Sequence, residues 1–198
     1  MNQWLFILLL AIPAGLWAQQ PKMYLKAFAG VNSHRYVYRE RDVQSDFFPG
    51  WQGGFGFRIS RRRAFAEVDF NFIRFTARIP GEDLDLENDL RFKFNSFELP
   101  LTAGWIPIKE PLVKWYLYSG LVNRFNGRIR ARFEDEELDF KPKDAGLPVY
   151  NLGFRLGSQV DVAMLNLDFS YTINLTNGVR DVIRTNVHAV LFNVGFVF

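Results

Sequence analysis

The sequence contains two histidines, His34 and His188, and no cysteine. A catalytic histidine needs a nucleophile or a carboxylate within hydrogen-bond reach. His34 follows Ser33, but neighbouring side chains on a strand point to opposite faces, and His188 has Val190 two residues on rather than a serine. The absence of cysteine excludes disulfides, thiolate metal sites and a cysteine nucleophile. We therefore interpret His34 as a residue of the first loop and His188 as an interface residue, and we expect neither enzyme activity nor a cofactor.

Two acidic runs, at residues 83–89 and 134–137, lie between basic residues. The first alternates carboxylates as a calcium site can, but it lacks the glycine and the distal glutamate of an EF-hand loop. The basic residues beside the two runs are Arg74, Arg78, Arg91, Lys93, Arg128, Arg130, Arg132, Lys141 and Lys143. We interpret both segments as hairpins that continue beyond the main fold, with opposite charges paired across strands. The alternative is that their tips bind cations that bridge lipopolysaccharide, or a partner protein.

The stretch 165–175 indicates the kind of element that carries these residues. Its odd positions carry Leu, Leu, Phe, Tyr, Ile and Leu, and its even positions carry Asn, Asp, Ser, Thr and Asn. A strand with this pattern has one apolar face and one polar face. The length of the stretch matches the roughly 9–11 residues that a tilted strand needs to cross a bilayer. We interpret the apolar face as lipid-facing and the polar face as the inside of a closed barrel.

Seven further segments alternate in the same way, at 23–32, 51–60, 64–72, 91–105, 113–125, 150–159 and 187–198. The eight strand centres fall near Ala27, Phe55, Val68, Leu99, Leu117, Phe154, Phe169 and Val194. The pattern predicts a bulge near Ile73, and a phase shift at residues 95–96 that turns Phe92 and Phe94 outward. Short connections at 61–63, 107–111 and 161–164 alternate with long ones. An even strand number with this alternation predicts an all-β fold, an eight-stranded antiparallel up-and-down transmembrane barrel.

Aromatic residues make up 17% of the chain and fall at both ends of the predicted strands. Trp51, Phe92, Phe125 and Tyr150 mark one end, and Trp105, Trp115 and Phe198 mark the other. Two such girdles are typical of membrane barrels at the two interfaces. The last segment places apolar residues in one phase and ends on an aromatic residue. We interpret Phe192, Phe196 and Phe198 as a signal for the machinery that assembles such barrels.

The polar faces predict a charged interior. An eight-stranded barrel is only wide enough for side chains to fill it. The inward set includes Lys26, Arg58, Lys114, Arg124 and Arg155 together with Glu67, Asp69, Glu98 and Asp168. An unpaired buried charge is costly, so these groups must pair. For Glu98 the candidate partners are Lys114 or Arg124 on the adjacent strand, and Arg58 or Arg155 across the lumen. We predict a plugged, ion-paired lumen, with a narrow ion path as the alternative.

The beginning of the chain has the pattern of a targeting segment. Residues 4–17 are apolar but too short for a spanning helix, and Ala18 makes a plausible cleavage site. No lysine or arginine precedes this run, and an N-terminal anchor is the alternative. We predict a signal peptide at 1–18 and an outer-membrane barrel domain at 19–198, with both barrel termini on the periplasmic side.

Four short motifs are similar to those of a known family. They are Gly30-Val31-Asn32, Phe97-Glu98-Leu99-Pro100-Leu101, Tyr118-Ser119-Gly120 and the terminal Gly195-Phe196-Val197-Phe198. Through them the chain resembles the outer-membrane β-barrel family of Bacteroidetes that includes PorT-like proteins, often labelled a porin family. The resemblance implies an eight-stranded outer-membrane barrel, and the PorT branch is linked to a secretion system for gliding and protease cargo. It does not imply a pore.

These observations predict a non-enzymatic integral outer-membrane barrel of a Gram-negative cell, which acts in structure, adhesion or secretion-complex assembly through extracellular loops. The expected partners are outer-membrane lipid and lipopolysaccharide, the barrel assembly machinery, and a secretion or surface complex. A net charge of +3 with mixed signs argues against nucleic-acid binding. The alternatives are a lipid-modifying barrel enzyme, a narrow ion or solute channel, and a soluble lipocalin-like barrel, which would need an apolar interior.

Overall fold

The computed structural model describes residues 21–38, 48–79, 90–133, 136–141, 148–176 and 185–198. The predicted signal peptide (1–18) and the acidic run at 83–89 lie outside these residues. The described chain forms nine strands, β1 (Lys22–Tyr38), β2 (Phe48–Arg61), β3 (Ala64–Ile79), β4 (Leu90–Lys109), β5 (Val113–Phe133), β6 (Glu136–Phe140), β7 (Tyr150–Val162), β8 (Leu165–Asn174) and β9 (Thr185–Val197). In these residues no helix is long and apolar enough to cross a membrane.

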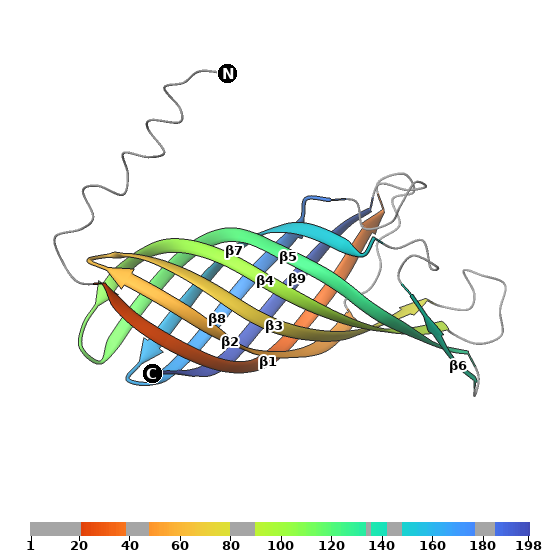
Figure 1. Cartoon of the computed structure of the whole chain (residues 1–198), viewed down its shortest axis with the longest axis horizontal. Helices are drawn as coiled ribbons and strands as arrows, with labels where there is room; N and C mark the ends of the chain where they lie inside the picture. Colours follow the sequence, from red (N-terminus) through yellow and green to blue (C-terminus); the bar gives the residue numbers. More distant parts are fainter. Residues whose placement is uncertain (1–20, 39–47, 80–89, 134–135, 142–147, 177–184) are drawn as a thin grey trace, which may run out of the picture.

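Eight of the strands form one closed antiparallel barrel, which confirms the predicted fold (Figure 1). Each strand of the wall pairs with its neighbours along the chain, and β1 pairs with β9 to close the ring. The backbone of Phe198 extends this seam, because its nitrogen and oxygen lie 2.8 and 3.1 Å from their partners on Leu25. Strand β6 does not enter the wall but pairs back onto the distal part of β5. Figure 1 shows β6 beyond the end of the barrel that is opposite to the C-terminus.

The two ends of the barrel differ in their connections. At the end that we call the turn end, short turns join β2 to β3, β4 to β5 and β7 to β8. Arg62 and Ala163 have positive φ angles of 50° and 54°, as two-residue hairpin turns require. The turns are tighter than predicted, so that Asp161, expected in a connection, belongs to β7. The other connections lie at the opposite end, which we call the loop end.

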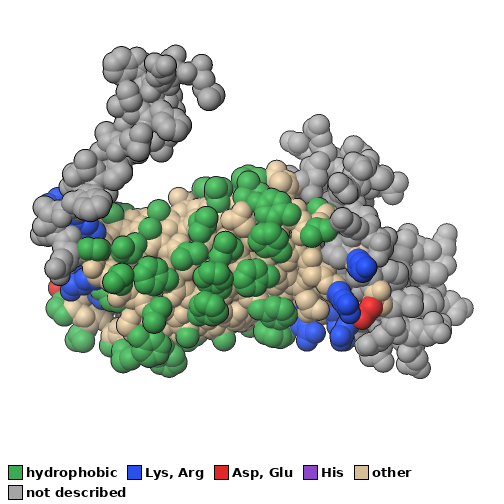
Figure 2. All heavy atoms as spheres, in the orientation of Figure 1, with side chains coloured by type: hydrophobic (Ala, Val, Ile, Leu, Met, Phe, Trp, Pro, Cys, Tyr) green, Lys and Arg blue, Asp and Glu red, His purple; other side chains and the backbone are tan. Residues whose placement is uncertain are grey.

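Alternation along the strands separates an apolar outside from a mainly polar inside. In β8, Leu165, Leu167, Phe169 and Tyr171 are exposed, whereas the residues between them are buried. Figure 2 shows the resulting apolar band across the middle of the visible face of the barrel, with basic side chains at both ends. More polar than apolar residues are buried among those described. This inside-out arrangement fits a barrel in lipid and contradicts a soluble barrel with an apolar ligand cavity.

Aromatic side chains lie on the outside at both ends of this band. Trp51, Phe125 and Tyr150 are exposed towards the loop end, and Trp105 and Phe198 are exposed towards the turn end. The indole of Trp115 is half-buried and donates a hydrogen bond to Ser158 Oγ at 2.8 Å. The side chain of Phe92 is not among those that the structure describes.

The predicted phase changes in β3 and β4 were wrong. β3 keeps one register with β2 and with β4 across Ile73, so there is no bulge at this position. β4 also keeps its register with β3 through residues 95–96, and Phe94 packs inside the barrel. The irregularity lies instead in the pairing with β5, which shifts by one residue between Phe94 and Ser96. The lumen is apolar at this level, and apolar residues on the inner face concealed the alternation.

Candidate functional site

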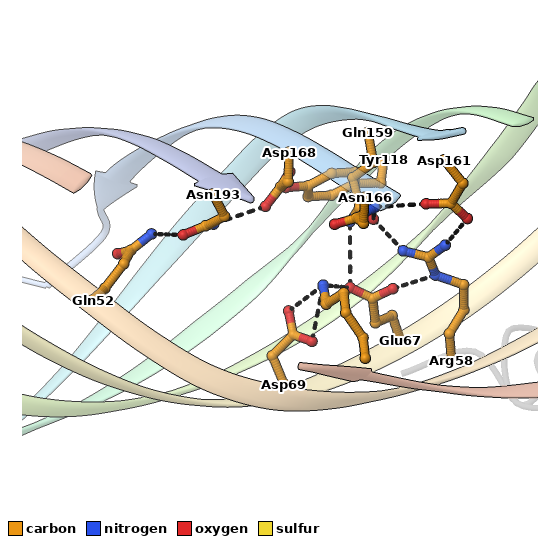
Figure 3. Close-up of polar contacts among 11 residues, drawn as sticks. Gln52, Arg58, Glu67, Asp69, Tyr118, Gln159, Asp161, Asn166, Asp168 and Asn193 are labelled. Carbon is orange, nitrogen blue, oxygen red and sulfur yellow. Dashed lines mark hydrogen bonds and ion pairs between the residues drawn. The ribbon is translucent and has the colours of Figure 1, made fainter. Parts of the chain in front are cut away.

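The first group of inward charges lies in the half of the lumen near the turn end, and we call it the turn network. It consists of Lys26, Arg58, Glu67, Asp69 and Asp161, all of them buried. The Glu67 carboxylate is shared, because it accepts hydrogen bonds from both Lys26 Nζ and Arg58 Nε. Lys26 Nζ also lies 3.2 Å from Asp69 Oδ1, and Arg58 Nη1 donates to Asp161 Oδ2 at 2.9 Å (Figure 3). Each cation therefore holds two carboxylates, which is how a buried charge is compensated.

Neutral groups hold the Arg58 guanidinium in place. Its Nη2 donates to Gln159, and its plane lies over the Tyr116 ring, 4.2 Å from the ring centroid. Asn166 Nδ2 donates to the second oxygen of Asp161 at 2.6 Å. Figure 3 shows Gln159, Asp161 and Glu67 around this guanidinium, and Asn166 bonded to Gln159 and Asp161 behind them. The arrangement satisfies a planar fork of donors with fixed acceptors, which suits arginine better than lysine.

Asp168 belongs to an adjoining hydrogen-bonded chain and not to the ion pairs. Its carboxylate accepts from Tyr118 OH at 2.7 Å and from Asn193 Nδ2 at 3.0 Å, and Gln52 donates to Asn193 (Figure 3). Among the described residues it has no ion-pair partner within 4.0 Å. Gly157 makes this chain possible, since a Cβ there would collide with the Tyr118 ring.

The second group of charges lies in the half of the lumen nearer the loop end, and we call it the Glu98 group. Glu98 is fully buried and accepts hydrogen bonds from Arg124 Nε and Arg155 Nη2, each at 2.7 Å. Arg155 Nε donates in turn to Thr172 Oγ1 at 2.8 Å. Arg124 is the register partner of Glu98 on β5, whereas Arg155 reaches it from β7. Of the four partners left open by the sequence, Glu98 therefore binds one on the adjacent strand and one across the lumen.

Lys114, like Asp168, is a predicted lumen charge that joins neither group. Its side chain is half-buried near the turn end, and Nζ lies 4.8 Å from the centroid of the Tyr24 ring. The Tyr24 hydroxyl lies 3.5 Å from the same nitrogen. Lys114 therefore contacts an aromatic ring at the mouth of the barrel and does not contribute to the interior ion pairs.

A layer of apolar side chains fills the lumen on the loop-end side of the Glu98 group. We call it the apolar layer, and it consists of Ile73, Phe75, Phe94, Ala189 and Leu191. The rings of Phe75 and Phe94 stack at a centroid distance of 4.9 Å. This layer was not predicted, because Ile73 was expected at a bulge and Phe94 on the outside.

His34 lies beside the apolar layer and not in a loop as predicted. It belongs to β1, is fully buried, and stacks on Phe75 with 4.1 Å between the ring centroids. Neither ring nitrogen has a hydrogen-bond partner in the part of the chain that the structure describes. The strand continues past position 32 because residues 26–38 pair with β9 without interruption.

His188 lies on the outside of the barrel. The Tyr171 hydroxyl contacts its Nδ1 at 2.6 Å. Among the described residues, no hydrogen bond joins His188 to a serine or a carboxylate, and no group of three or more His, Asp or Glu side chains could hold a metal ion. The described outer face thus offers no catalytic triad around this histidine.

The second charged hairpin bears out the expectation that opposite charges pair across its strands. β6 continues β5 as a hairpin, and Arg130 Nε lies 3.3 Å from Asp139 Oδ1 across it, as predicted for paired opposite charges. Across β3, β4 and β5, however, the register places like charges opposite each other. The backbone partners are Arg78 with Arg91, Arg91 with Arg132, and Lys93 with Arg130. Opposite charges are therefore paired on the outermost hairpin, whereas the backbone register of the wall beneath it sets basic residues opposite each other.

Comparison with solved structures places the fold among small outer-membrane barrels. Ail, the attachment invasion locus protein of Yersinia pestis, solved in complex with the heparin analogue sucrose octasulfate, superimposes with a TM-score of 0.54 at 12% identity, covering 89% of this chain and 99% of Ail. Neisserial surface protein A superimposes with a TM-score of 0.51 at 13% identity, covering 90% of this chain and 99% of that protein. No protein-family model and no curated protein sequence matches the chain. At these identities the likeness establishes the fold alone.

Proposed function

We propose that the chain is a non-enzymatic integral outer-membrane barrel whose lumen is closed and whose loop end carries its function. The single observation that carries this proposal is the burial of the inward side chains. Arg58, Gln52 and Glu98 face the lumen, yet their exposed fractions are 1%, 1% and 0%. The lining of an open pore would be accessible to water. A side-chain-filled interior instead makes the barrel a rigid support for what projects from it.

Two further features support closure. The turn network and the Glu98 group cross the lumen, since Arg58 on β2 binds Asp161 on β7, and Arg155 on β7 binds Glu98 on β4. The apolar layer adds a barrier beyond them, because hydrophobic constrictions exclude water and ions. A solute would have to break several buried ion pairs and then cross this layer.

The location and orientation form part of the same proposal. The exposed apolar band and its aromatic girdles favour an outer-membrane location, with the turn end in the periplasm and the loop end outside. The name of Ail as an attachment protein favours adhesion as one role for a barrel of this fold. The resemblance to PorT-like proteins of Bacteroidetes favours a second role, in assembly of a secretion complex. Both roles act through the loop end.

The test separates the loop end from the lumen. In one variant, residues 133–140 are replaced by a short Asn-Gly turn, which removes β6 and keeps the β5 residues that pair with β4. In the control variant, Glu67→Gln alters only the lumen. We expect affinity capture of the intact chain from solubilised outer membranes to lose its partners in the hairpin variant and to keep them in the lumen variant. Unchanged partners in the hairpin variant, with loss in the lumen variant, would overturn the proposal.

A further inference from the structure

A basic patch lies on the outer face of the barrel at the loop end. We define it by the described side chains of Arg74 on β3, Lys93 on β4, and Arg128 and Arg130 on β5. Arg128 and Arg130 are exposed, and Arg74 and Lys93 are partly exposed. The patch lies just beyond the exposed Phe72, on the loop-end side of the apolar band. Figure 2 shows basic side chains gathered at this border.

The register gives this patch an unfavourable arrangement. Lys93 and Arg130 are cross-strand partners. One step further out, the backbone of Arg91 pairs with Arg78 on one side and with Arg132 on the other. Like charges directly opposite each other destabilise a sheet. Among the described side chains, Asp139 contacts Arg130 at 3.3 Å, and both groups are half exposed. An anion bound between the strands would remove this repulsion.

The remainder of the loop-end wall differs. The outward residues of β8, β9 and β1 at the same end include Ile173, Val190 and Ser33, followed further out by the cross-strand partners His188 and Arg35. Among the described outward side chains at this end, four basic residues lie on β3 to β5, and Arg35 lies on β1. Directly opposite side chains lie about 5 Å apart, so Lys93 and Arg130 can both reach one phosphate group.

We infer that the basic patch binds the phosphate groups of an outer-leaflet glycolipid such as lipid A. The occupant follows from continuity, because the patch borders directly on the lipid-facing Phe72 and Phe97. A ligand that carries a phosphate beside acyl chains covers both surfaces at once, whereas a soluble polyanion would leave the apolar part unused. The inference rests on the proposed function, since it requires the loop end to face outwards.

Binding would be measured with the full-length chain refolded in detergent micelles. The probes are lipid A with its phosphates, lipid A with its phosphates removed, and phosphatidylglycerol. We expect the parent to prefer phosphorylated lipid A. The variant K93Q/R130Q should bind it about 30-fold more weakly, because each basic residue near an anionic surface contributes about a fivefold factor. The control R62Q/R63Q removes the same charge from the exposed turn at the other end and should bind as the parent does.

Two further measurements separate a loss of binding from a loss of folding. Without lipid, K93Q/R130Q should melt no lower than the parent, because it relieves a like-charge pair. The swap K93R/R130K preserves charge and should preserve binding. Equal affinity of the parent for dephosphorylated lipid A or for phosphatidylglycerol would overturn the inference, as would undiminished binding by K93Q/R130Q or lost binding by the swap. Conductance through the barrel would overturn the proposed function and leave this binding result unaffected.

Discussion

The two charged groups of the lumen both compensate buried charges, but one has an excess of carboxylates and the other an excess of cations. The turn network sets two cations against three carboxylates, Glu67, Asp69 and Asp161. The Glu98 group sets one carboxylate against two arginines. Carboxylates therefore outnumber cations near the turn end, and cations outnumber carboxylates towards the loop end. The comparison implies that a carboxylate can be lost at low cost in the first group but not in the second.

The neighbours of the two groups differ in the same sense. Gln159 and Asn166 supply additional partners to the turn network. The Glu98 group has Thr172 as a neutral partner, and the apolar layer with the stacked His34 lies on the side towards the loop end. A charged side chain that loses its partner in the turn network still has amide side chains beside it. A charged side chain that loses its partner in the Glu98 group lies beside the apolar layer. The loop-end half is therefore the part of the lumen where a single change should matter most.

The largest effect is expected for Glu98→Gln. The change keeps the shape but leaves Arg124 and Arg155 without a carboxylate among their described contacts. We expect the free energy of unfolding in detergent to fall by about 3–5 kcal/mol, as for a buried pair broken on one side. Unfolding by urea, followed by the heat-dependent gel mobility of the barrel, measures it. If the variant unfolds like the parent while a loop-end activity disappears, Glu98 has a functional role and not a structural one.

Phe75→Ala tests the apolar layer beside that group. Phe75 is buried and stacks on both His34 and Phe94. We expect a loss of about 3–4 kcal/mol, because a buried aromatic ring leaves a cavity. Phe72→Ala is the matched control on the same strand, where the exposed ring faces outward. Acyl chains replace its contacts, so the control should lose only about 1 kcal/mol. Equal losses in the two variants would mean that the layer is not packed.

Glu67→Gln tests the redundancy of the turn network. Lys26 would keep Asp69 and Arg58 would keep Asp161, so both cations retain a carboxylate. We expect a loss of about 1–3 kcal/mol, the scale of hydrogen bonds to charged groups, which is smaller than that of Glu98→Gln. The same unfolding assay compares the two variants directly. A larger loss for Glu67→Gln would reverse the proposed order of the two groups.

Alternation in the sequence was sufficient to separate lipid-facing from inward residues where the inner face is polar. In β8 the predicted lipid-facing and inward residues are those that the structure exposes and buries. The same pattern was misleading at Ile73 and Phe94, where the inner face is apolar and the outer face carries Arg74 and Lys93, because the apolar phase was expected to face lipid everywhere. It also placed Asp161 in a turn and His34 in a loop. The partner of Asp161 is Arg58, 103 residues away, and no local pattern can indicate a contact at that separation.

The smallest effect on stability is expected for Phe198→Asp. The side chain is exposed at the turn end, and its backbone bonds with Leu25 do not depend on its type. A carboxylate near the interface should cost about 1 kcal/mol at most. We nevertheless expect less assembled barrel in the outer membrane, because Phe198 with Phe192 and Phe196 forms the proposed assembly signal. Normal amounts of heat-modifiable barrel in cells would contradict that role, and Phe198→Trp should assemble as the parent does.

Single-channel recording in a planar bilayer tests the closed lumen most directly. The parent barrel should show no steady conductance in molar salt, because buried ion pairs and the apolar layer both obstruct the path. The Phe75→Ala variant should show brief openings at most, since the Glu98 group still crosses the lumen. A stable, voltage-independent conductance of the parent, unchanged by Phe75→Ala, would contradict the account.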